Sequence, residues 1–274
     1  MQAIPIFVVS LARATERRAT ITAHLRGLGL DFTLMDAVDG RAMSEAERQA
    51  LSPPGVEWHP GVVGCYMSHL QIYEKMLTES IEIALILEDD AELNPEFSPA
   101  LHAGLASKEF DYCFLDGHPQ NPDGAIYYDA SDSIQLYGKF RANRTHAGLG
   151  GTHAYLITRA AAERRMAHAL PIIQPIDVYA HLPYRPRFYA MIRPNAGAWT
   201  SEHGLVSYTK AEGDRPTATN LAWLRRTLIF YRVRNAIHPE MIRRRIRKWQ
   251  MLKSGVLPAS GRWRPMPSGR FLPR

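Results

Sequence analysis

The stretch IEIALILEDDAEL, Ile81–Leu93, decides the predicted fold of this chain. Its first part, 81–87, is apolar with one exception and rich in β-branched residues, which predicts a strand buried on both faces of a sheet. Three consecutive acids follow, which we name the acidic triplet: Glu88, Asp89 and Asp90. Ligands of open α/β sheets bind just beyond the carboxyl ends of such strands, so the acidic triplet lies where a binding site is expected.

The acidic triplet has two interpretations. Three neighbouring carboxylates repel one another strongly unless a cation, or hydrogen-bond donors of a ligand, offset their charge, and this favours a metal and ligand site. Alternatively, the triplet is an acidic turn that leads into a helix. Asn94-Pro95 supports this alternative, because it has the pattern of an N-cap followed by proline at the first helical position and predicts a helix over 95–107.

The start of the chain predicts the unit of a parallel sheet. Residues 4–11 are expected to form a buried strand, an apolar stripe at helical spacing predicts a helix over 13–28, and 31–35 is expected to form a second strand. A strand–helix–strand unit of this kind favours an α/β fold with a mostly parallel central sheet.

The first strand-to-helix turn of such a sheet approaches the phosphates of a bound nucleotide. We therefore expect Ser10, Arg13 and Arg17 near the phosphates. The turn does not contain a Gly-x-Gly-x-x-Gly pattern, so the sequence does not predict a dinucleotide site of that type.

The remaining segments predict further strands and helices around the sheet. Apolar periodicity predicts a helix over 62–77 with Ser68 and His69 at its middle, where a lone His is more often a packed residue than a ligand. Residues 121–136 have the Pro, Gly, Asp and Ser content of a loop, with a weak strand as the alternative. The other expected elements are a short capped helix from Ser44, strands over 110–115, 152–158 and 186–200, and a helix over 159–170.

Two isolated residues late in the chain have both a structural and a functional interpretation. Asp177 follows a proline-containing turn, where an Asp is usually the N-cap of a helix, here one over 178–182. His203 lies where a chain returning to the edge of the sheet could supply a metal ligand, although a lone His is more often packed within the fold.

Composition indicates a soluble globular protein of one large domain or two small ones. Of the 274 residues, 46% are hydrophobic and 22% are charged, and no apolar run approaches the ~18 residues that a membrane span needs. The N-terminal apolar run is short and lacks a preceding basic region, so it does not have the form of a secretory signal. Cys65 and Cys113 lie in apolar surroundings without metal-ligand spacing, which favours buried thiols in a reducing compartment.

The charge divides the chain at about residue 220. Residues 221–274 contain 14 of the 33 Lys and Arg but one of the 27 acids, a net charge of +13, which leaves 19 basic and 26 acidic residues, a net charge of −7, for 1–220. We predict an acidic body over 1–220 and a basic tail over 221–274, disordered from 254 onward. An apolar stripe with Trp249 beside arginines is typical of a helix on an anionic membrane, and packing of this stripe on the body is the alternative.

Five blocks, taken in order, resemble glycosyltransferase family 25, the lipooligosaccharide (LPS) galactosyltransferase-like proteins. They are FVVSLARATERR, GVVGCYMSHLQIYEKML, ALILEDDAEL, GTHAYLITRAAAERRM and PIIQPIDVYAHL, and they span roughly 4–182. The first block has Ser10 where the family usually has Asn. Any one block alone is a weak signal, whereas five in the family's order are a strong one.

This resemblance implies a GT-A-like fold, a nucleotide-binding α/β sandwich, with a UDP-sugar donor that is typically UDP-galactose and a divalent cation that is typically Mn²⁺. The acidic triplet corresponds to the family's metal and nucleotide motif, whose hard oxygen ligands suit Mn²⁺ or Mg²⁺. We expect Asp90 to bind the metal, and Glu88 or Asp89 to orient it or bond the ribose. The other expected site residues are His203 for the metal and Ser68 and His69 for the nucleotide.

The family is understood to invert the anomeric centre, which requires a carboxylate as the general base for the acceptor hydroxyl. Asp177 is the expected base, because it is an acid in a matching block far in sequence from the acidic triplet. Asp116, at the end of the strand predicted over 110–115, is the second choice.

The resemblance and the basic tail together favour an inverting glycosyltransferase at the cytoplasmic face of a bacterial inner membrane, where it extends a lipid-linked or LPS oligosaccharide. A non-catalytic family member that binds a glycan or a partner is the alternative, and the intact acidic triplet and Asp177 argue against it. Nucleic-acid binding through the tail is a third hypothesis, which no aromatic-rich recognition motif supports.

Overall fold

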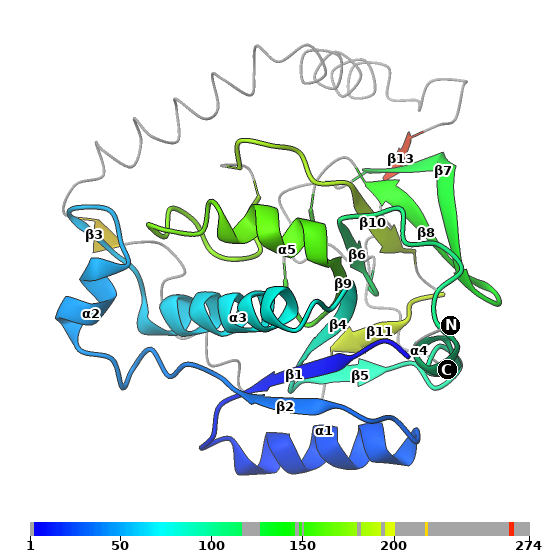
Figure 1. Ribbon diagram of the computed structural model, residues 1–274, viewed down its shortest axis with the longest axis horizontal. Helices are drawn as coiled ribbons and strands as arrows, with labels where there is room; N and C mark the ends of the chain where they lie inside the picture. Colours follow the sequence, from blue (N-terminus) through cyan, green and yellow to red (C-terminus); the bar gives the residue numbers. More distant parts are fainter. Residues whose placement is uncertain are drawn as a thin grey trace.

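The computed structural model describes most of the acidic body and little of the basic tail. Side chains are described over residues 3–116, 128–145, 148–149, 151–179, 182–192 and 195–200, and the backbone alone at 127, 217–218 and 263–265. Within these ranges the chain forms one large sheet with helices against both faces, together with two small two-stranded sheets (Figure 1).

The large sheet has nine strands in the order β13-β7-β8-β10-β6-β9-β4-β1-β2. Their bounds are Ile6–Ser10 (β1), Thr33–Asp36 (β2), Ile83–Glu88 (β4), Tyr112–Phe114 (β6), Tyr127–Tyr137 (β7), Phe140–Thr145 (β8), Ala154–Thr158 (β9), Phe188–Met191 (β10) and Trp263–Pro265 (β13). β1 runs parallel to both β2 and β4, which confirms the strand–helix–strand unit predicted at the start of the chain.

The prediction of a mostly parallel sheet is wrong, because the sheet is mixed. Among the described strands, three neighbouring pairs are parallel and five are antiparallel. Parallel neighbours need a crossover connection, which is usually a helix. Between β6 and β9 the chain instead forms the β7–β8 hairpin, and β9 lies between β4 and β6 in the opposite direction to both.

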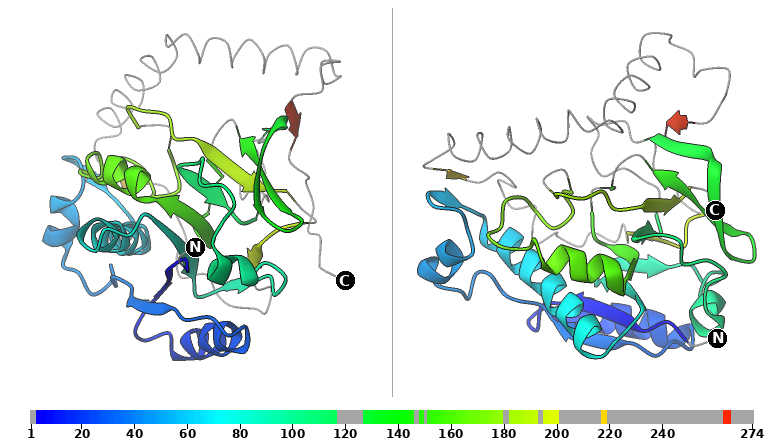
Figure 2. Two further views of the ribbon diagram at one scale, coloured as in Figure 1. Left: turned by 45° about the vertical axis from the view of Figure 1, so that its right-hand side comes forward. Right: turned by 45° about the horizontal axis from the view of Figure 1, so that its top comes forward.

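Helices cover the two faces of the sheet over two separate cores (Figures 1 and 2). Their bounds are Thr15–Gly27 (α1), Glu45–Ala50 (α2), Pro60–Thr78 (α3), Pro99–Ala103 (α4) and Arg159–Met166 (α5). α3 and α5 lie side by side on one face, whereas α1 and α4 pack on the other. Successive residues of β4 alternate between the cores, with Ile86 beneath α3 and Leu85 beneath α1, as expected for a strand buried on both faces.

Local capping and turn signals account for two helix boundaries. α2 begins with the predicted capping box, in which the Ser44 hydroxyl accepts a hydrogen bond from the backbone N–H of Glu47, and the Glu47 carboxylate accepts one from the backbone N–H of Ser44. α1 is followed by Gly29 at φ +68°, a left-handed conformation that glycine adopts without strain.

The helix predicted after the acidic triplet is shorter than expected and begins later. Residues 91–93 form the strand β5 (Ala91–Leu93), which pairs with β11 (Ala198–Thr200). Asn94 then accepts a hydrogen bond of 3.0 Å from the backbone N–H of Glu96, so it closes a turn instead of opening a helix, and the only helical residues within 95–107 are those of α4.

The segment over 121–136, predicted as a loop with a weak strand as the alternative, contains most of β7. Pairing with β8 along much of its length outweighs the Asp and Ser content of this strand, which would favour a loop in isolation. Irregular register within the β7–β8 pair accommodates some of these polar residues.

Two further short strands pair with distant parts of the chain. β3 (Val56–Glu57) pairs with β12 (Thr217–Ala218), and β13 pairs with β7. β13 lies within the segment for which the sequence predicts disorder, and the rest of the basic tail lies outside the described residues. In the part of the chain that the structure describes, no helix has the length and apolar character that crossing a membrane requires.

Candidate functional site

A cluster of polar side chains lies at one edge of the large sheet. The edge consists of the carboxyl ends of β1, β4 and β6 and the amino end of β9, which runs in the opposite direction. Buried polar groups are destabilising unless they are bonded, so their contacts indicate what this edge can bind. The polar residues here are Ser10, Glu88, Asp89, Asp90, Asp116, Thr152 and His153.

Arg17 and Ser10 hold the two aspartates of the acidic triplet. Arg17, in α1, forms ion pairs with both, and its Nη2 lies 3.1 Å from Oδ2 of Asp90. The Ser10 hydroxyl donates a hydrogen bond of 2.5 Å to Oδ2 of Asp89. Burial raises the pKa of Asp89, although Ser10 and Arg17 act against that shift. The structure thus places Ser10 and Arg17 directly against the acidic triplet.

Asp90 is the member of the triplet with an unsatisfied buried oxygen. Its Oδ1 is buried and has no hydrogen-bond partner in the described part of the chain. Burial, together with the charges of Glu88 and Asp89, raises the pKa of Asp90 to about 6, while Arg17 opposes the shift. A buried carboxylate oxygen beside two further acids fits a hard divalent cation such as Mn²⁺ or Mg²⁺.

Glu88 lies between polar groups from two other elements. Its Oε1 accepts a hydrogen bond from the Thr152 hydroxyl, and Nε2 of His69 lies 3.8 Å from the same oxygen. Burial acts to raise the pKa of Glu88, but His69 and Thr152 outweigh burial, so the pKa lies below its usual range. Glu88 therefore stays ionised at a pH at which Asp90 takes up a proton.

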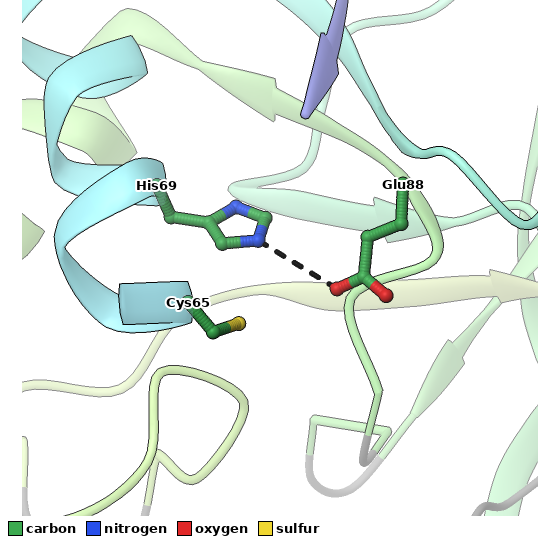
Figure 3. A group of neighbouring side chains, drawn as sticks. All are labelled: Cys65, His69 and Glu88. Carbon is green, nitrogen blue, oxygen red and sulfur yellow. Dashed lines mark ion pairs between the residues drawn. The ribbon is translucent and has the colours of Figure 1, made fainter. Parts of the chain in front are cut away.

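His69 is fully buried on α3 and belongs to a hydrogen-bonded aromatic network. Its Nδ1 lies 2.8 Å from the hydroxyl of Tyr155, which lies 2.8 Å from the hydroxyl of Tyr73. This network supports the packed interpretation of His69, and the same ring also faces Glu88 (Figure 3).

Two other predicted site residues, Arg13 and Ser68, bind other residues of the chain. Arg13 forms an ion pair with Asp39 near the surface. Ser68 accepts a hydrogen bond of 2.8 Å from the backbone N–H of Val38 and donates one of 2.6 Å to the carbonyl of Gly64. The Ser68 bonds join α3 to the segment that follows β2.

Asp177 does not cap a helix, which corrects the structural interpretation of this residue. The chain at 176–179 forms a turn and then irregular backbone, and Oδ2 of Asp177 accepts a hydrogen bond of 2.8 Å from the backbone N–H of Gly151. Gly151 precedes Thr152, whose hydroxyl binds Glu88. Asp177 is therefore attached to the sheet edge that carries the acidic triplet.

A buried arginine supports the turn that carries Asp177. Arg165, in α5, is fully buried and donates a hydrogen bond of 3.1 Å to the carbonyl of Ile176. Its guanidinium carbon lies 5.7 Å from the ring centroid of Tyr179, so it contacts residues on both sides of Asp177.

The sequence profile of glycosyltransferase family 25 (LPS biosynthesis protein) matches residues 3–180, about two thirds of the chain. This chain belongs to glycosyltransferase family 25. The matched region includes the acidic triplet and Asp177, and it confirms the family resemblance of the five sequence blocks.

Proteins similar to this family 25 chain include animal members of the family. A glycosyltransferase 25 family member of Anopheles gambiae is 26% identical over 192 residues, covering 64% of this chain and 30% of that protein. The probable inactive glycosyltransferase 25 family member 3 of Bos taurus is 28% identical over 196 residues, covering 65% and 31%. Procollagen galactosyltransferase 2 of Homo sapiens is 26% identical over 109 residues, covering 35% and 17%. The chain thus spans about a third or less of the length of these relatives.

Among solved structures, a glycosyltransferase involved in the glycosylation of the major capsid of PBCV-1 aligns with 69% of this chain and 80% of its own chain. The sequence identity is 12% and the TM-score is 0.38.

The sequence did not point to two of the residues at this family 25 site, Thr152 and His153. Nε2 of His153 lies 3.7 Å from Oδ2 of Asp116, and both side chains are buried. Alternation over 152–158 predicts the strand but not its direction. Only the antiparallel course of β9 brings its first residues to the edge where β4 and β6 end.

The predicted metal ligand His203 lies outside the described residues. β11 ends at Thr200, which pairs with Ala91 immediately after the acidic triplet. The role of His203 therefore stays a prediction.

Proposed function

We propose that this chain is a metal-dependent, inverting glycosyltransferase that moves a hexose from a UDP-sugar to a lipid-linked or lipopolysaccharide oligosaccharide. Metal dependence is supported by the buried Oδ1 of Asp90, a residue of the acidic triplet. This oxygen has no hydrogen-bond partner within the described residues. A divalent cation there would offset both the charge of the triplet and the charge that develops on the diphosphate leaving group.

The residues at the sheet edge are proposed to bind the cation and the nucleotide and to orient them. Asp90 is the proposed ligand of Mn²⁺ or Mg²⁺, and Glu88 or Asp89 orients the cation or bonds the ribose. Arg17 and Ser10 fix the Asp89 carboxylate, and Arg17 also limits the repulsion between the two aspartates. The remaining proposed binding residues are Arg13, Ser68 and His69 for the nucleotide and His203 for the metal.

Asp177 is the proposed general base. As the bond between the anomeric carbon and the phosphate oxygen breaks, the acceptor hydroxyl attacks from the opposite face and its proton passes to the Asp177 carboxylate. The bond from Gly151 and the support from Arg165 fix this carboxylate relative to the acidic triplet.

The substrates are proposed by analogy with the family. One relative is named a procollagen galactosyltransferase, which supports galactose as the transferred sugar. The family description, LPS biosynthesis protein, supports an oligosaccharide acceptor of the lipopolysaccharide type. The net charge of +13 on residues 221–274 supports a peripheral position at the cytoplasmic face of the inner membrane, where anionic lipid would attract the tail.

A second candidate function is binding without catalysis. Relatives of Bos taurus and Homo sapiens are named probable inactive and inactive family members, and each is 28% identical over 196 residues. The acidic triplet with an open ligand oxygen at Asp90, and Asp177 held at the same edge, favour catalysis in this chain.

Hydrolysis of UDP-sugars separates the two candidates, because many transferases slowly use water as an acceptor. We expect the full chain to release UDP from UDP-galactose faster than from other UDP-hexoses, only with Mn²⁺ or Mg²⁺, and not after chelation. Asp90→Ala is the control and should release none above background. UDP binding without release from any UDP-sugar would favour the non-catalytic candidate.

A further inference from the structure

Three side chains bring three kinds of metal-ligating atom to one point between α3 and the end of β4 (Figure 3). They are Cys65, His69 and Glu88, which we name the thiol cluster. Cys65 and His69 are four residues apart on α3 and therefore share one face of the helix. The cysteine sulfur, a His69 ring nitrogen and a Glu88 carboxylate oxygen all lie within 4.8 Å of one another.

One nitrogen of His69 faces this point and has no hydrogen bond. The His69 side chain is fully buried, and its Nε2 has no hydrogen-bond partner within the described residues. The distance of 3.8 Å to Oε1 of Glu88 is too long for a hydrogen bond. A buried polar atom left in this state is destabilising, and a ligand bound to Nε2 would remove the penalty.

The other ring nitrogen of His69, Nδ1, is hydrogen-bonded to a protein group, as it usually is in metal-binding histidines. Nδ1 lies 2.8 Å from the hydroxyl of Tyr155, which lies 2.8 Å from that of Tyr73. In metal sites such an outer contact fixes the tautomer and the orientation of the ring. Here it holds Nε2 toward Glu88, and the Cys65 side chain lies beside the two (Figure 3).

We infer that the thiol cluster is a binding site for a borderline-soft divalent cation of the Zn²⁺ class. Zn²⁺ binds thiolate, imidazole and carboxylate at about 2.0–2.3 Å, so tetrahedral ligand atoms lie roughly 3.5 Å apart. The 3.8 Å between Nε2 of His69 and Oε1 of Glu88 is close to that spacing, and the outer limit of 4.8 Å for the three ligand atoms exceeds it by about 1.3 Å. Binding would release the Cys65 thiol proton to solvent, and three protein ligands leave a fourth position for water or a substrate atom.

This site differs in chemistry from the one proposed at Asp90. Oxygen donors favour Mg²⁺ or Mn²⁺, whereas thiolate and imidazole favour Zn²⁺, Co²⁺ or Cd²⁺. Glu88 belongs to both the acidic triplet and the thiol cluster, and His69 is also among the residues proposed to bind the nucleotide. A cation in the thiol cluster would therefore compete with Thr152 for the Glu88 carboxylate and with the nucleotide for His69. The inference rests on this geometry and does not depend on transferase activity.

Cobalt binding tests the inference, because a thiolate bound to Co²⁺ gives a charge-transfer absorption band in the near ultraviolet. The full chain is titrated with Co²⁺ in excess Mg²⁺, which occupies sites made of hard oxygen ligands. We expect the band to saturate at one equivalent and to disappear when Zn²⁺ is added. Cys65→Ala should lose the band, because it removes the thiolate that gives rise to it.

Two matched variants make the test specific. Cys113→Ala removes the other cysteine, which is buried in β6, and Asp90→Ala removes the ligand proposed for the hard cation; both should keep the band. Circular dichroism confirms that each variant is folded, and Cys65→Ser replaces Cys65→Ala if the latter is not. A band that survives without Cys65, that is lost without Cys113 or Asp90, or that never forms in the parent chain overturns the inference.

Discussion

At the scale of single residues, the proposed chemistry depends most directly on Asp177. Asp177→Asn keeps the volume of the side chain and an oxygen that can accept the bond from Gly151, but it removes the basicity. We expect the transfer rate to fall by roughly 10²–10⁴-fold, the contribution of a general base, with the affinity for Mn²⁺-UDP unchanged. Initial rates of transfer and calorimetric binding of Mn²⁺-UDP measure the two quantities.

Asp116→Asn is the matched control for Asp177→Asn, because Asp116 is the second choice for the general base. Asp116 follows β6, at the same edge of the sheet as the acidic triplet. Its carboxylate faces His153, and we expect a smaller effect on transfer than that of Asp177→Asn. Transfer by Asp177→Asn within tenfold of the parent, or a larger loss in Asp116→Asn, would exclude Asp177 as the base.

The raised pKa of Asp90 gives a stability prediction with a definite sign. The pKa is about 6 in the folded chain against an ordinary value of 3.8, so the folded state binds this proton more tightly than the unfolded state. The stability from this group is fully present below pH 3.8 and is lost as the pH rises through 6. Ionised Asp90 should therefore destabilise the metal-free chain at pH 7 by about 3 kcal/mol.

Asp90→Asn removes that ionisation while leaving Arg17 paired with Asp89. We expect the free energy of unfolding to rise by about 3 kcal/mol at pH 7, and the gain to shrink as the pH falls from 6 toward 4. Urea denaturation with a chelator present, at pH 7 and at pH 4.5, measures the difference. A variant that is less stable than the parent at pH 7 would show that the sign is wrong.

Residue patterns predicted the acidic triplet and Ser10 as site residues, but not Thr152 and His153. The acidic triplet and Ser10 each end a predicted buried strand, and ligands of open α/β sheets bind just beyond such strand ends, so their meeting at one edge was predictable. Thr152 and His153 begin a strand, and the sequence does not encode that β9 enters the sheet antiparallel to β4. The attachment of Asp177 to Gly151 is a contact between distant loops, which local patterns cannot show.

At the scale of elements, α3 is positioned by a close backbone contact with the segment after β2. A Cβ atom added to Gly64 would lie 2.4 Å from the carbonyl oxygen of Val38, and one added to Gly40 would lie 1.9 Å from that of Pro60. Such contacts cannot be relieved by a side-chain rotation. They fix the position of the helix that carries Cys65 and His69.

We predict that Gly64→Ala lowers the free energy of unfolding by about 3 kcal/mol, because the added methyl group would push α3 away from this segment. Gly27→Ala is the control, since nothing lies within 4 Å of its added Cβ in α1. That variant should be at least as stable as the parent, because Ala has the higher helix propensity. Thermal unfolding of both measures the difference, and equal effects would contradict the close contact.

Elements were predictable where apolar periodicity is strong. The buried strands β1 and β4 and the helices α1 and α3 lie where the periodicity places them. β7 was predicted only as a weak alternative to a loop, because its Asp and Ser residues resemble a loop and its stability comes from pairing with β8. α4 was predicted too long, because Asn94 and Pro95 form a turn after β5.

At the scale of the whole molecule, the division of charge predicts membrane association through the basic tail. Each cation near an anionic surface contributes about 1 kcal/mol, so replacing Arg243, Arg244 and Arg245 by Gln should weaken binding to anionic vesicles by about a hundredfold. Sedimentation with anionic and with neutral vesicles measures this. Equal binding by parent and variant, or a steeply salt-dependent affinity for DNA or RNA that exceeds the affinity for vesicles, would contradict a membrane role.

We propose that the acidic triplet binds a divalent cation together with the nucleotide of a sugar donor. Calorimetry of UDP binding with and without Mn²⁺, in the parent chain and in Asp90→Ala, tests it most directly. We expect Mn²⁺ to strengthen UDP binding in the parent, and Asp90→Ala to abolish this effect while the variant stays folded. Unchanged Mn²⁺-UDP affinity in Asp90→Ala would contradict the claim.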